Sequence, residues 1–586
     1  MFKKENLELL QRQLKEDGLS AYLILTGDSH ASEYAAAYFL AERKYFCPFT
    51  GSAGQVLVTQ DKAYLFTDGR YFIQAEKQLE GSGIELMRIG QKGVPPLADF
   101  IKQENLYPLG VNCSMISANF YKKLLKKGEG VVDKDYSTFV ENRPQLPLDK
   151  LWKLEKNLYT LDHEKKIDNI LKEVEKSGAE ANLVTTLDDI AWILNVRGND
   201  IPCNPVFYSY LYLSKKYGNH LFVNLKKIDF EISGVTLHPY EEIVDFIKEH
   251  KDVETLVDEN KVSARLIKNL SRPVAGRNPS YLMKSIKGKV EIENTKKVHV
   301  LDGLAMLKFI AFIDENINNN LTEFDYAEEL EKYRRENSLC YDLSFGTISA
   351  CGPNAAQMHY APTKTVNTVV TPDQMELLVD SGGQYYGGTT DTTRTFALGK
   401  LTDEYIKDYT LTLKSVIALS TSVFMDGSSG VTLDYQARKF MWNEGMDYKC
   451  GTGHGVGYML NVHEGPNGFR YRIVPERDDS DKIVPGMITT VEPGVYKEGK
   501  YGIRIENNLV CVPAYETDMG TFYKHETITC VPIDTKALDL SIMTDEEIDW
   551  LNDYHQFVYD KLAPLCDERL LKVLKEKTKK ISRKND

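Results

Sequence analysis

The sequence predicts a mixed α/β protein whose amino-terminal half contains two copies of one α/β domain, followed by a third, larger domain. The first observation is a repeat, because apolar residues at helical spacing lead into a glycine and a short apolar segment twice. The paired positions are 160 residues apart: Leu7, Leu10, Leu14, Gly18, Ala21 and Leu23 in one copy, and Ile167, Ile170, Val174, Gly178, Ala181 and Leu183 in the other. The second observation is that each copy continues into a β-branched and aromatic run typical of a hairpin, at 55–69 and 208–224.

A proline-containing segment separates the two copies. Residues 141–152, ENRPQLPLDKLW, are expected to form a linker, because proline does not fit a helix interior or a central strand. A helical periodicity from Val290 to Ile310 opens the third domain. The predicted domains are therefore 1–150, 151–287 and 288–586.

The third domain shows further local signals. A helix is expected to begin near Thr322, since Asp325 follows three residues later in a capping-box pattern. Glycine-rich, strand-like segments continue to about residue 533, and a charged helical tail is predicted over 544–586.

The composition is that of an ordinary globular protein. Of the 586 residues, 42% are hydrophobic and 27% are charged, which excludes a disordered chain. The formal net charge of −13 leads us to expect no nucleic-acid partner and no membrane association. The amino terminus lacks the apolar run of a signal peptide, and the nine cysteines form no CxxC pair, so a cytoplasmic location is expected.

Four carboxylates and one histidine of the third domain lie at the ends of strand-like runs or in glycine-rich turns: Asp380, Asp391, His454, Glu492 and Glu506. A glycine-rich hairpin between Asp380 and Asp391 would turn both side chains inward. The glycines of CGTGHGVG let the backbone approach closely around His454. Glu492 directly follows an apolar run, and Glu506 shares one face of an alternating segment with Arg504.

These acidic groups indicate a metal site when they are taken together. Singly, Asp380 is well explained as a turn residue and Glu506 as a solvated strand residue. Carboxylates that converge on one cavity would raise one another's pKa, and two divalent cations would remove this cost. Oxygen-rich ligation with one imidazole favours manganese, iron, cobalt or zinc in a dinuclear hydrolase, and the residue chemistry alone leaves the choice open.

An ordered series of motifs resembles the pita-bread metallopeptidase family, and within it the three-domain Xaa-Pro aminopeptidases, also called aminopeptidase P. The matching segments run along the whole chain: FTDGRYFIQA, ILNVRGNDIPCNPVFYSY, SFGTISACGPNAAQMHYAP, VDSGGQYYGGTTDTTRT, CGTGHGVGYMLNVHEGP and VEPGVYKEGKYGIRIEN. The spacings, 11 residues from Asp380 to Asp391 and 14 from Glu492 to Glu506, make the series specific. The resemblance implies two creatinase-like α/β domains followed by a pita-bread catalytic domain.

The resemblance also implies a role for each site residue. The ligands of a dinuclear centre, usually described as manganese, would be Asp380, Asp391, His454, Glu492 and Glu506, with Asp391 and Glu506 bridging the two ions. His359 and His463 would lie in the substrate cleft and hold the substrate or donate to the tetrahedral oxyanion. Glu492 would also carry a proton from the nucleophile to the proline nitrogen, and Arg504 would orient the carboxylates from behind.

Two positions depart from the pattern of the family. Cys450 stands where the family usually has the first histidine of HGTGHGVG, and Gly387 stands where an aspartate is common. Position 450 lines the substrate cleft in the family and is not a metal ligand. We therefore expect metal binding to survive, while the rate or the substrate preference changes.

The predicted reaction is release of the N-terminal residue from peptides with proline in the second position. The bond to proline has no N–H and a restricted geometry, so the enzyme must accept a rigid ring on the leaving side. One alternative is an Xaa-Pro dipeptidase (prolidase), although the duplicated amino-terminal half favours the aminopeptidase. The other is a non-catalytic pita-bread binding protein, in which ligands are typically lost. The resemblance further implies a homodimer.

Overall fold

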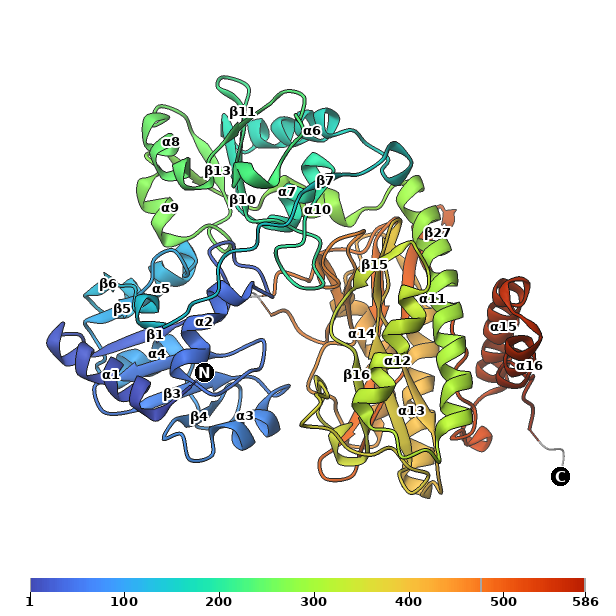
Figure 1. Cartoon of the computed structure of the whole chain (residues 1–586). Coiled ribbons are helices and arrows are strands. Elements are labelled where there is room, and N and C mark those ends of the chain that lie inside the picture. Colours follow the sequence, from blue (N-terminus) through green and yellow to red (C-terminus); the bar gives the residue numbers. More distant parts are fainter. Residues whose placement is uncertain (1, 475–476, 584–586) are drawn as a thin grey trace. The chain divides into compact units, whose positions relative to one another are not determined.

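The computed structural model describes residues 2–474 and 477–583, which form two compact units (Figure 1). Unit 1 comprises Met1–Leu154 and Leu161–Tyr281, and unit 2 comprises Glu155–Thr160 and Leu282–Asp586. Unit 1 contains most of both predicted α/β domains, whereas residues 155–160 and 282–287 of the second belong to unit 2. The boundaries at residues 150 and 287 stay predictions. All nine cysteines are free thiols. Within the described ranges, no helix has the length and apolar character needed to cross a bilayer.

The first half of unit 1 is built on a six-stranded sheet with the order β4-β3-β2-β1-β5-β6. β2 runs antiparallel to β1 and β3, whereas β5 is parallel to β1 and β4 is parallel to β3. The strands are β1 (Ala21–Ile24), β2 (Gln55–Thr59), β3 (Ala63–Thr67), β4 (Glu85–Arg88), β5 (Leu109–Val111) and β6 (Val131–Asp133). The helices are α1 (Lys4–Glu16), α2 (Ala37–Phe46), α3 (Phe72–Leu79), α4 (Leu97–Gln103) and α5 (Ala118–Lys127).

The second half of unit 1 repeats this topology. Its sheet has the order β12-β11-β10-β8-β13-β14, with parallel and antiparallel pairs at the same positions. The strands are β8 (Ala181–Val184), β10 (Ser209–Ser214), β11 (Gly218–Val223), β12 (Val235–His238), β13 (Thr255–Val257) and β14 (Pro273–Ala275), and the helices are α6 (His163–Lys176), α7 (Leu187–Leu194), α8 (Ile243–Glu249) and α9 (Ala264–Asn269). The predicted duplication is confirmed, as are the hairpins, which are β2–β3 and β10–β11.

The repeated residues explain why the two copies fold alike. Helix α1 buries Leu7, Leu10 and Leu14, and α6 buries the residues 160 positions later. The repeated glycines lie just past the helix ends, where Gly18 has a φ of +66° and Gly178 a φ of +81°. Glycine adopts this left-handed conformation without a Cβ clash, so it ends each helix and turns the chain into the central strand. Of the predicted linker 141–152, residues 141–151 contain no helix or strand, whereas Trp152 begins the short strand β7 (Trp152–Lys153).

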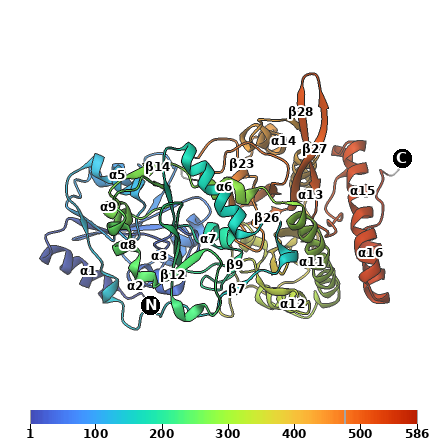
Figure 2. The same ribbon diagram turned by 90° about the horizontal axis from the view of Figure 1, so that it is seen from above.

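Unit 2 begins with two helices, α11 (Lys289–Asn316) and α12 (Glu323–Arg335), which lie side by side in both views (Figures 1 and 2). The helical periodicity from Val290 is confirmed by α11, and the capping box of Thr322 and Asp325 is formed at the start of α12. A buried ion pair joins the helices, since Arg334 Nε donates to Asp302 Oδ1 at 2.7 Å. Tyr385 of the following sheet also donates to Asp302, at 2.7 Å.

The strands of unit 2 form three main sheets, ordered β16-β17-β20, β15-β18-β19 and β21-β28-β27-β24-β22-β23, and a β25–β26 pair. Their bounds are β15 (Cys340–Leu343), β16 (Ile348–Cys351), β17 (Glu376–Ser381), β18 (Gly383–Tyr385), β19 (Gly388–Thr389), β20 (Thr392–Ala397), β21 (Val423–Met425), β22 (Gly453–Gly455), β23 (Glu464–Phe469), β24 (Ile488–Val491), β25 (Gly494–Lys497), β26 (Tyr501–Arg504), β27 (Asn507–Thr517) and β28 (Gly520–Thr527). β27 and β28 form a long projecting hairpin (Figure 2).

The remaining helices of unit 2 pack on these sheets or close the chain. They are α13 (Asp403–Ser420), α14 (Gly430–Asn443), α15 (Asp545–Leu562) and α16 (Glu568–Lys577), and α10 (Pro279–Ser285) spans the division between the units. The predicted helical tail is α15 and α16, which lie side by side in both views (Figures 1 and 2). The sheets, rather than these helices, carry the residues of the candidate site.

Candidate metal centre

The two aspartates are brought together by antiparallel strands. β17 pairs with β20 so that Asp380 lies opposite Thr393 and Ser381 lies opposite Thr392, which leaves Asp391 at the start of the returning strand. The glycine-rich segment between them forms the small β18–β19 hairpin, as the sequence predicts. Both aspartates are buried, with 8% of Asp380 and 4% of Asp391 exposed.

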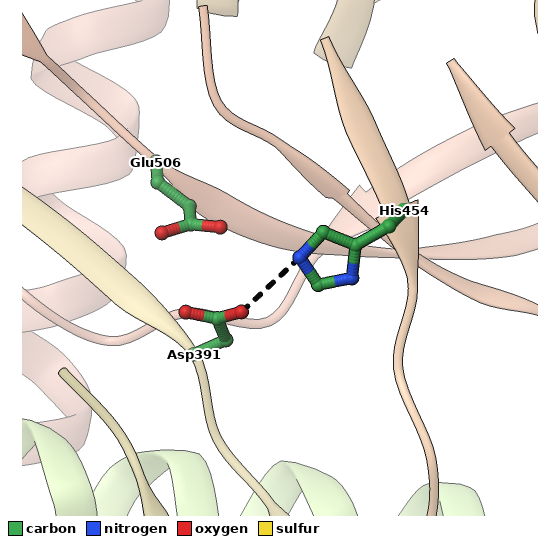
Figure 3. Close-up of side chains that lie close together, drawn as sticks. All are labelled: Asp391, His454 and Glu506. Carbon is green, nitrogen blue, oxygen red and sulfur yellow. Dashed lines mark ion pairs between the residues drawn. The ribbon is translucent and has the colours of Figure 1, made fainter. Parts of the chain in front are cut away.

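His454 and Glu506 reach the same point from the six-stranded sheet of unit 2. His454 is the middle residue of β22, and Glu506 lies between β26 and β27. One ligand atom from each of Asp391, His454 and Glu506 lies within 4.8 Å of the other two, and Figure 3 shows the three side chains turned toward one another. Glu506 is only 1% exposed, so the structure excludes the alternative in which Glu506 is a solvated strand residue.

The imidazole of His454 is oriented to bind a cation. Its Nδ1 lies 2.9 Å from the carbonyl oxygen of Gly455, which can only accept, so Nδ1 carries the proton. Its Nε2 then faces two carboxylates, at 3.3 Å from Asp391 Oδ2 and 3.4 Å from Glu492 Oε1. A hydrogen bond that the other ring nitrogen donates to a backbone carbonyl is the usual arrangement of a metal-bound histidine.

The electrostatics of this cluster favour a bound cation. Burial raises the pKa of Asp380 to about 6 despite the opposing charge of Arg504, and the charges of Asp391 and Glu492 add to the increase. Burial, followed by the charges of Asp391 and Asp380, raises the pKa of Glu506 well above its usual range. Burial lowers the pKa of His454, but its hydrogen bond to Asp391 and the charge of Glu492 outweigh burial and raise it to about 9. The cluster therefore holds excess negative charge that a cation would neutralise.

One carboxylate oxygen of Asp380 is also available to bind a metal. Asp380 Oδ2 accepts from Arg504 Nη2 at 2.6 Å, whereas no donor among the described residues reaches the buried Asp380 Oδ1. A buried carboxylate oxygen without a donor is costly unless a cation binds it. The donor set of carboxylates and one imidazole is therefore suited to a divalent metal.

Arg504 contacts Asp380 of the cluster, and its role in orienting the carboxylates stays a prediction. Besides Asp380, its guanidinium donates to Thr393 Oγ1 at 3.1 Å and to Tyr496 Oη at 2.7 Å. Thr393 in turn donates to Glu506 Oε2 at 2.7 Å. One guanidinium thus holds Asp380 directly and Glu506 through Thr393.

The three residues expected in the substrate cleft, His359, Cys450 and His463, have different surroundings in the structure. The ring of His463 packs edge to face on His454, with 4.2 Å between the ring centroids. His359 follows Met358, whose carbonyl oxygen accepts from Arg504 Nη2 at 3.4 Å. Cys450 is half-buried, and burial followed by the charge of Glu492 raises the pKa of its thiol to about 11. The roles of His359, His463 and Cys450 stay predictions.

Sequence reasoning missed the threonines that support the carboxylates. Thr393 contacts Glu506 and Arg504, and the hydroxyl of Thr490 accepts from the His454 backbone N–H at 3.1 Å and lies 3.3 Å from Glu492 Oε1. The available signal was local, since threonines flank Asp391 in TTDTTRT and precede Glu492 in ITTVE. Each of these hydroxyls can accept one hydrogen bond and donate another, which suits a residue behind a ligand.

Comparison with known families agrees with this fold. A model of metallopeptidase family M24 matches residues 293–513, and one of the C-terminal region of peptidase M24 matches 521–581. Models of the creatinase/prolidase N-terminal domain match 6–142 and 142–291. The fold and the site thus define a metallopeptidase with two creatinase-type domains before a pita-bread domain, and the predicted fold class is confirmed.

Relatives of similar length show which family of metallopeptidases the chain resembles over nearly its whole length. "Probable Xaa-Pro aminopeptidase P" of Coprinopsis cinerea is 36% identical, with 98% of each chain covered, and Xaa-Pro aminopeptidase 1 of Dictyostelium discoideum is 35% identical, with 96% of this chain and 94% of the relative covered. The chain belongs to the Xaa-Pro aminopeptidase P family, and the predicted family and enzyme class are confirmed.

Solved structures agree with this assignment. The X-prolyl aminopeptidase of Caenorhabditis elegans, described as a cytosolic enzyme with a di-nuclear active site, matches with a TM-score of 0.91 at 30% identity, over 99% of this chain and 100% of that chain. The prolidase of Pyrococcus horikoshii matches with a TM-score of 0.51 at 21% identity, over 63% of this chain and 99% of that chain, and shares the fold.

Proposed function

We propose that this chain is a metal-dependent aminopeptidase that releases the N-terminal residue from peptides with proline in the second position. The observation that carries the proposal is the convergence of Asp391, His454 and Glu506, whose ligand atoms lie within 4.8 Å of one another. The likeness to Xaa-Pro aminopeptidases over nearly the whole of both chains supports the substrate class.

The residues of the cluster would hold two divalent cations, for which we propose manganese, with cobalt, zinc and iron as the alternatives. The proposed ligands are Asp380, Asp391, His454, Glu492 and Glu506. When bound, the two cations would lower the pKa of a water molecule and polarise the scissile carbonyl. The protein contributes a buried, oxygen-rich cluster, in which Arg504, Thr393 and Thr490 hold the carboxylates in place.

Glu492 is the proposed proton carrier because it is the most accessible of these carboxylates. Its side chain is 22% exposed, compared with 6% for Asp391 and 12% for Asp380. Its backbone N–H donates to Thr452 O at 2.7 Å, which fixes the base of the side chain. A carboxylate so placed can take a proton from the nucleophile and deliver it to the proline nitrogen, which has no hydrogen of its own in the peptide.

Two histidines are the proposed substrate contacts. His463 packs against the ligand His454, and His359 lies in the loop that Arg504 holds through Met358. An imidazole N–H at either position can donate to the substrate carbonyl or to the oxyanion that develops from it. We further propose that the enzyme is a cytoplasmic homodimer that acts on proline-containing peptides.

The decisive experiment compares the hydrolysis of an Xaa-Pro-Xaa tripeptide, an Xaa-Ala-Xaa tripeptide and an Xaa-Pro dipeptide, with the metal content measured on the same sample. We expect two divalent ions per chain and rapid release of the first residue from Xaa-Pro-Xaa only. A chelator should abolish hydrolysis and lower the melting temperature, because it leaves the carboxylates crowded together. Hydrolysis of the dipeptide alone would instead favour a prolidase, and full activity without metal would refute the mechanism.

A further inference from the structure

A buried carboxylate outside the metal cluster has an unusual set of partners. Glu323 is the first residue of helix α12 and has no exposed surface. Its Oε1 accepts from the Cys351 backbone N–H at 2.8 Å, and its Oε2 accepts from Tyr360 Oη and the Thr368 backbone N–H, each at 2.8 Å. Asn354 Nδ2 donates to both oxygens, at 3.2 and 3.1 Å.

Burying this charge costs free energy that the donors must offset. The four donor residues are uncharged, and the amino terminus of α12 adds a favourable dipole because Glu323 lies in its first turn. A neutral residue at this position would avoid the free-energy cost of burying a charge. A buried carboxylate with this many donors therefore indicates that its hydrogen bonds hold a particular structure in place.

All four donor residues belong to one segment, 351–368, which leaves the end of β16 and returns before β17. Apart from Cys351, which is the last residue of β16, its regular structure is limited to the short 3-10 helix Gly352–Asn354. Long irregular segments are mobile unless hydrogen bonds to the rest of the protein hold them. Glu323 binds this segment, hereafter the 351–368 loop, at its first residue, at its last residue and at Tyr360 between them.

The other side of the 351–368 loop is held by the strand that carries Arg504. Arg504 Nη2 donates to Met358 O at 3.4 Å. At Gly502 of the same strand, a Cβ would come within 1.8 Å of the Ala355 carbonyl oxygen, so the backbones are in close contact. His359 therefore lies between Met358, which Arg504 holds, and Tyr360, which Glu323 holds.

We infer that Glu323 is a positioning residue for substrate binding, because it fixes the loop that presents His359. The inference rests on the proposed function, in which His359 contacts the peptide. Glu323 itself touches neither metal ligands nor substrate in this arrangement. Its loss should leave the metal cluster intact and weaken the binding of the peptide.

The test is Glu323→Gln, which keeps the volume but replaces one acceptor oxygen by an amide that only donates. We expect KM for an Xaa-Pro-Xaa peptide to rise about 10- to 100-fold, with kcat within about threefold, since small displacements of a binding group have effects of this size. The metal content should not change. Hydrogen exchange of the 352–368 amides should accelerate.

Three further variants separate positioning from general destabilisation. Asp325→Asn is the matched control, because Asp325 caps the same helix through Thr322, and it should lower the melting temperature without changing KM. Tyr360→Phe removes one donor with little change in volume, and it should raise KM by about two- to fivefold even where Glu323→Gln folds poorly. In a His359→Ala background, Glu323→Gln should have less than a twofold further effect, because both changes act on one interaction.

Two results would overturn the inference. One is an unchanged KM and unchanged amide exchange in Glu323→Gln, and the other is an equal effect of Glu323→Gln with and without His359. Either result would leave the proposed function standing if the wild-type protein cleaves Xaa-Pro-Xaa. A wild-type protein that binds two metal ions and cleaves no such peptide would overturn the proposed function together with this inference.

Discussion

Cys450 stands at the position where the resemblance leads us to expect a histidine. Its thiol is half-buried, and its high pKa keeps it neutral, so it can offer only a weak hydrogen bond. Its position is well defined, because Arg438 Nη2 donates to the Cys450 carbonyl oxygen at 3.2 Å. A histidine at this position would be a stronger donor and could carry a positive charge near the oxyanion.

We expect Cys450→His to raise turnover of an Xaa-Pro peptide by up to about 100-fold, because one good donor in a desolvated site is worth a factor of that order. The metal content should stay the same, since Cys450 is not a proposed ligand. The measurement is kcat together with metal analysis, and Cys450→Ser is the control for a change of donor without an imidazole. Equal or lower turnover in Cys450→His would show that the site does not need an imidazole at position 450.

The convergence of Asp391, His454 and Glu506 could be predicted from sequence because each of these residues stands in a distinctive local motif. Asp380 ends a buried strand, and Glu492 follows another, as their flanking apolar runs indicate. The contacts behind them could not be predicted in the same way. Thr393 forms hydrogen bonds with Glu506, which is 113 residues away in sequence, and with Arg504, which is 111 residues away. Such pairs depend on the packing of separate sheets.

At the scale of the elements, local sequence patterns predicted which helices and hairpins form, but they rarely predicted which distant strands pair. The helix at Val290, the capping box at Thr322 and the hairpins of unit 1 follow from periodicity and turn residues, which act over a few positions. The pairing of β18 with β15 depends on contacts between distant segments, so no local pattern indicates it. The burial of Glu323 could not be predicted from a local pattern either, because an acid at the start of a helix is usually exposed, whereas Glu323 is fully buried.

The packing of α2 on β1 predicts a pH dependence of stability. Glu42 of α2 accepts from Tyr22 Oη of β1 at 2.8 Å, and burial raises the pKa of Glu42 to about 7. The folded state thus holds the Glu42 proton more tightly than the unfolded state, so stability falls as the pH rises from about 4.5 through 7. The loss should amount to about 1–3 kcal/mol at pH 8.

The test is the melting temperature of wild type and Glu42→Gln from pH 5 to pH 8. Glutamine keeps an acceptor for Tyr22 and does not ionise, so the variant should become more stable relative to wild type as the pH rises. A constant difference across this range would show that Glu42 ionises normally in the folded protein. Glu5→Gln, a change in the first turn of α1, is the control for the loss of an exposed acid.

At the scale of the whole molecule, unit 2 presents an exposed aromatic cluster, which we define as Tyr435, Trp442 and Tyr471. Each is at least 42% exposed, and the ring of Trp442 lies 6.0 Å from that of Tyr435 and 5.7 Å from that of Tyr471. Aromatic residues gathered on a surface are typical of protein interfaces. We expect this cluster to lie in the proposed homodimer interface.

Light scattering at micromolar concentration should give a mass of twice the 66.6 kDa chain for the wild-type protein. Trp442→Glu places a charge in the cluster and should give the mass of a single chain. Met519→Glu, at an exposed apolar position of the projecting β27–β28 hairpin, should remain dimeric. A wild-type mass of one chain would refute the dimer, and a dimeric Trp442→Glu would place the interface elsewhere.

Residues 155–160 belong to unit 2, although the chain on either side of them belongs to unit 1. Thr160 N donates to Glu291 Oε1 at 2.9 Å, and Asn294 Nδ2 donates to Asn157 O at 2.9 Å, so α11 is the partner of this segment. The ribosome makes α11 after all of unit 1, and domains generally fold as they emerge. During translation, unit 1 can therefore fold before α11 has been made. Residues 155–160 are joined to unit 1 at both ends, and they bind α11 only after unit 1 has folded.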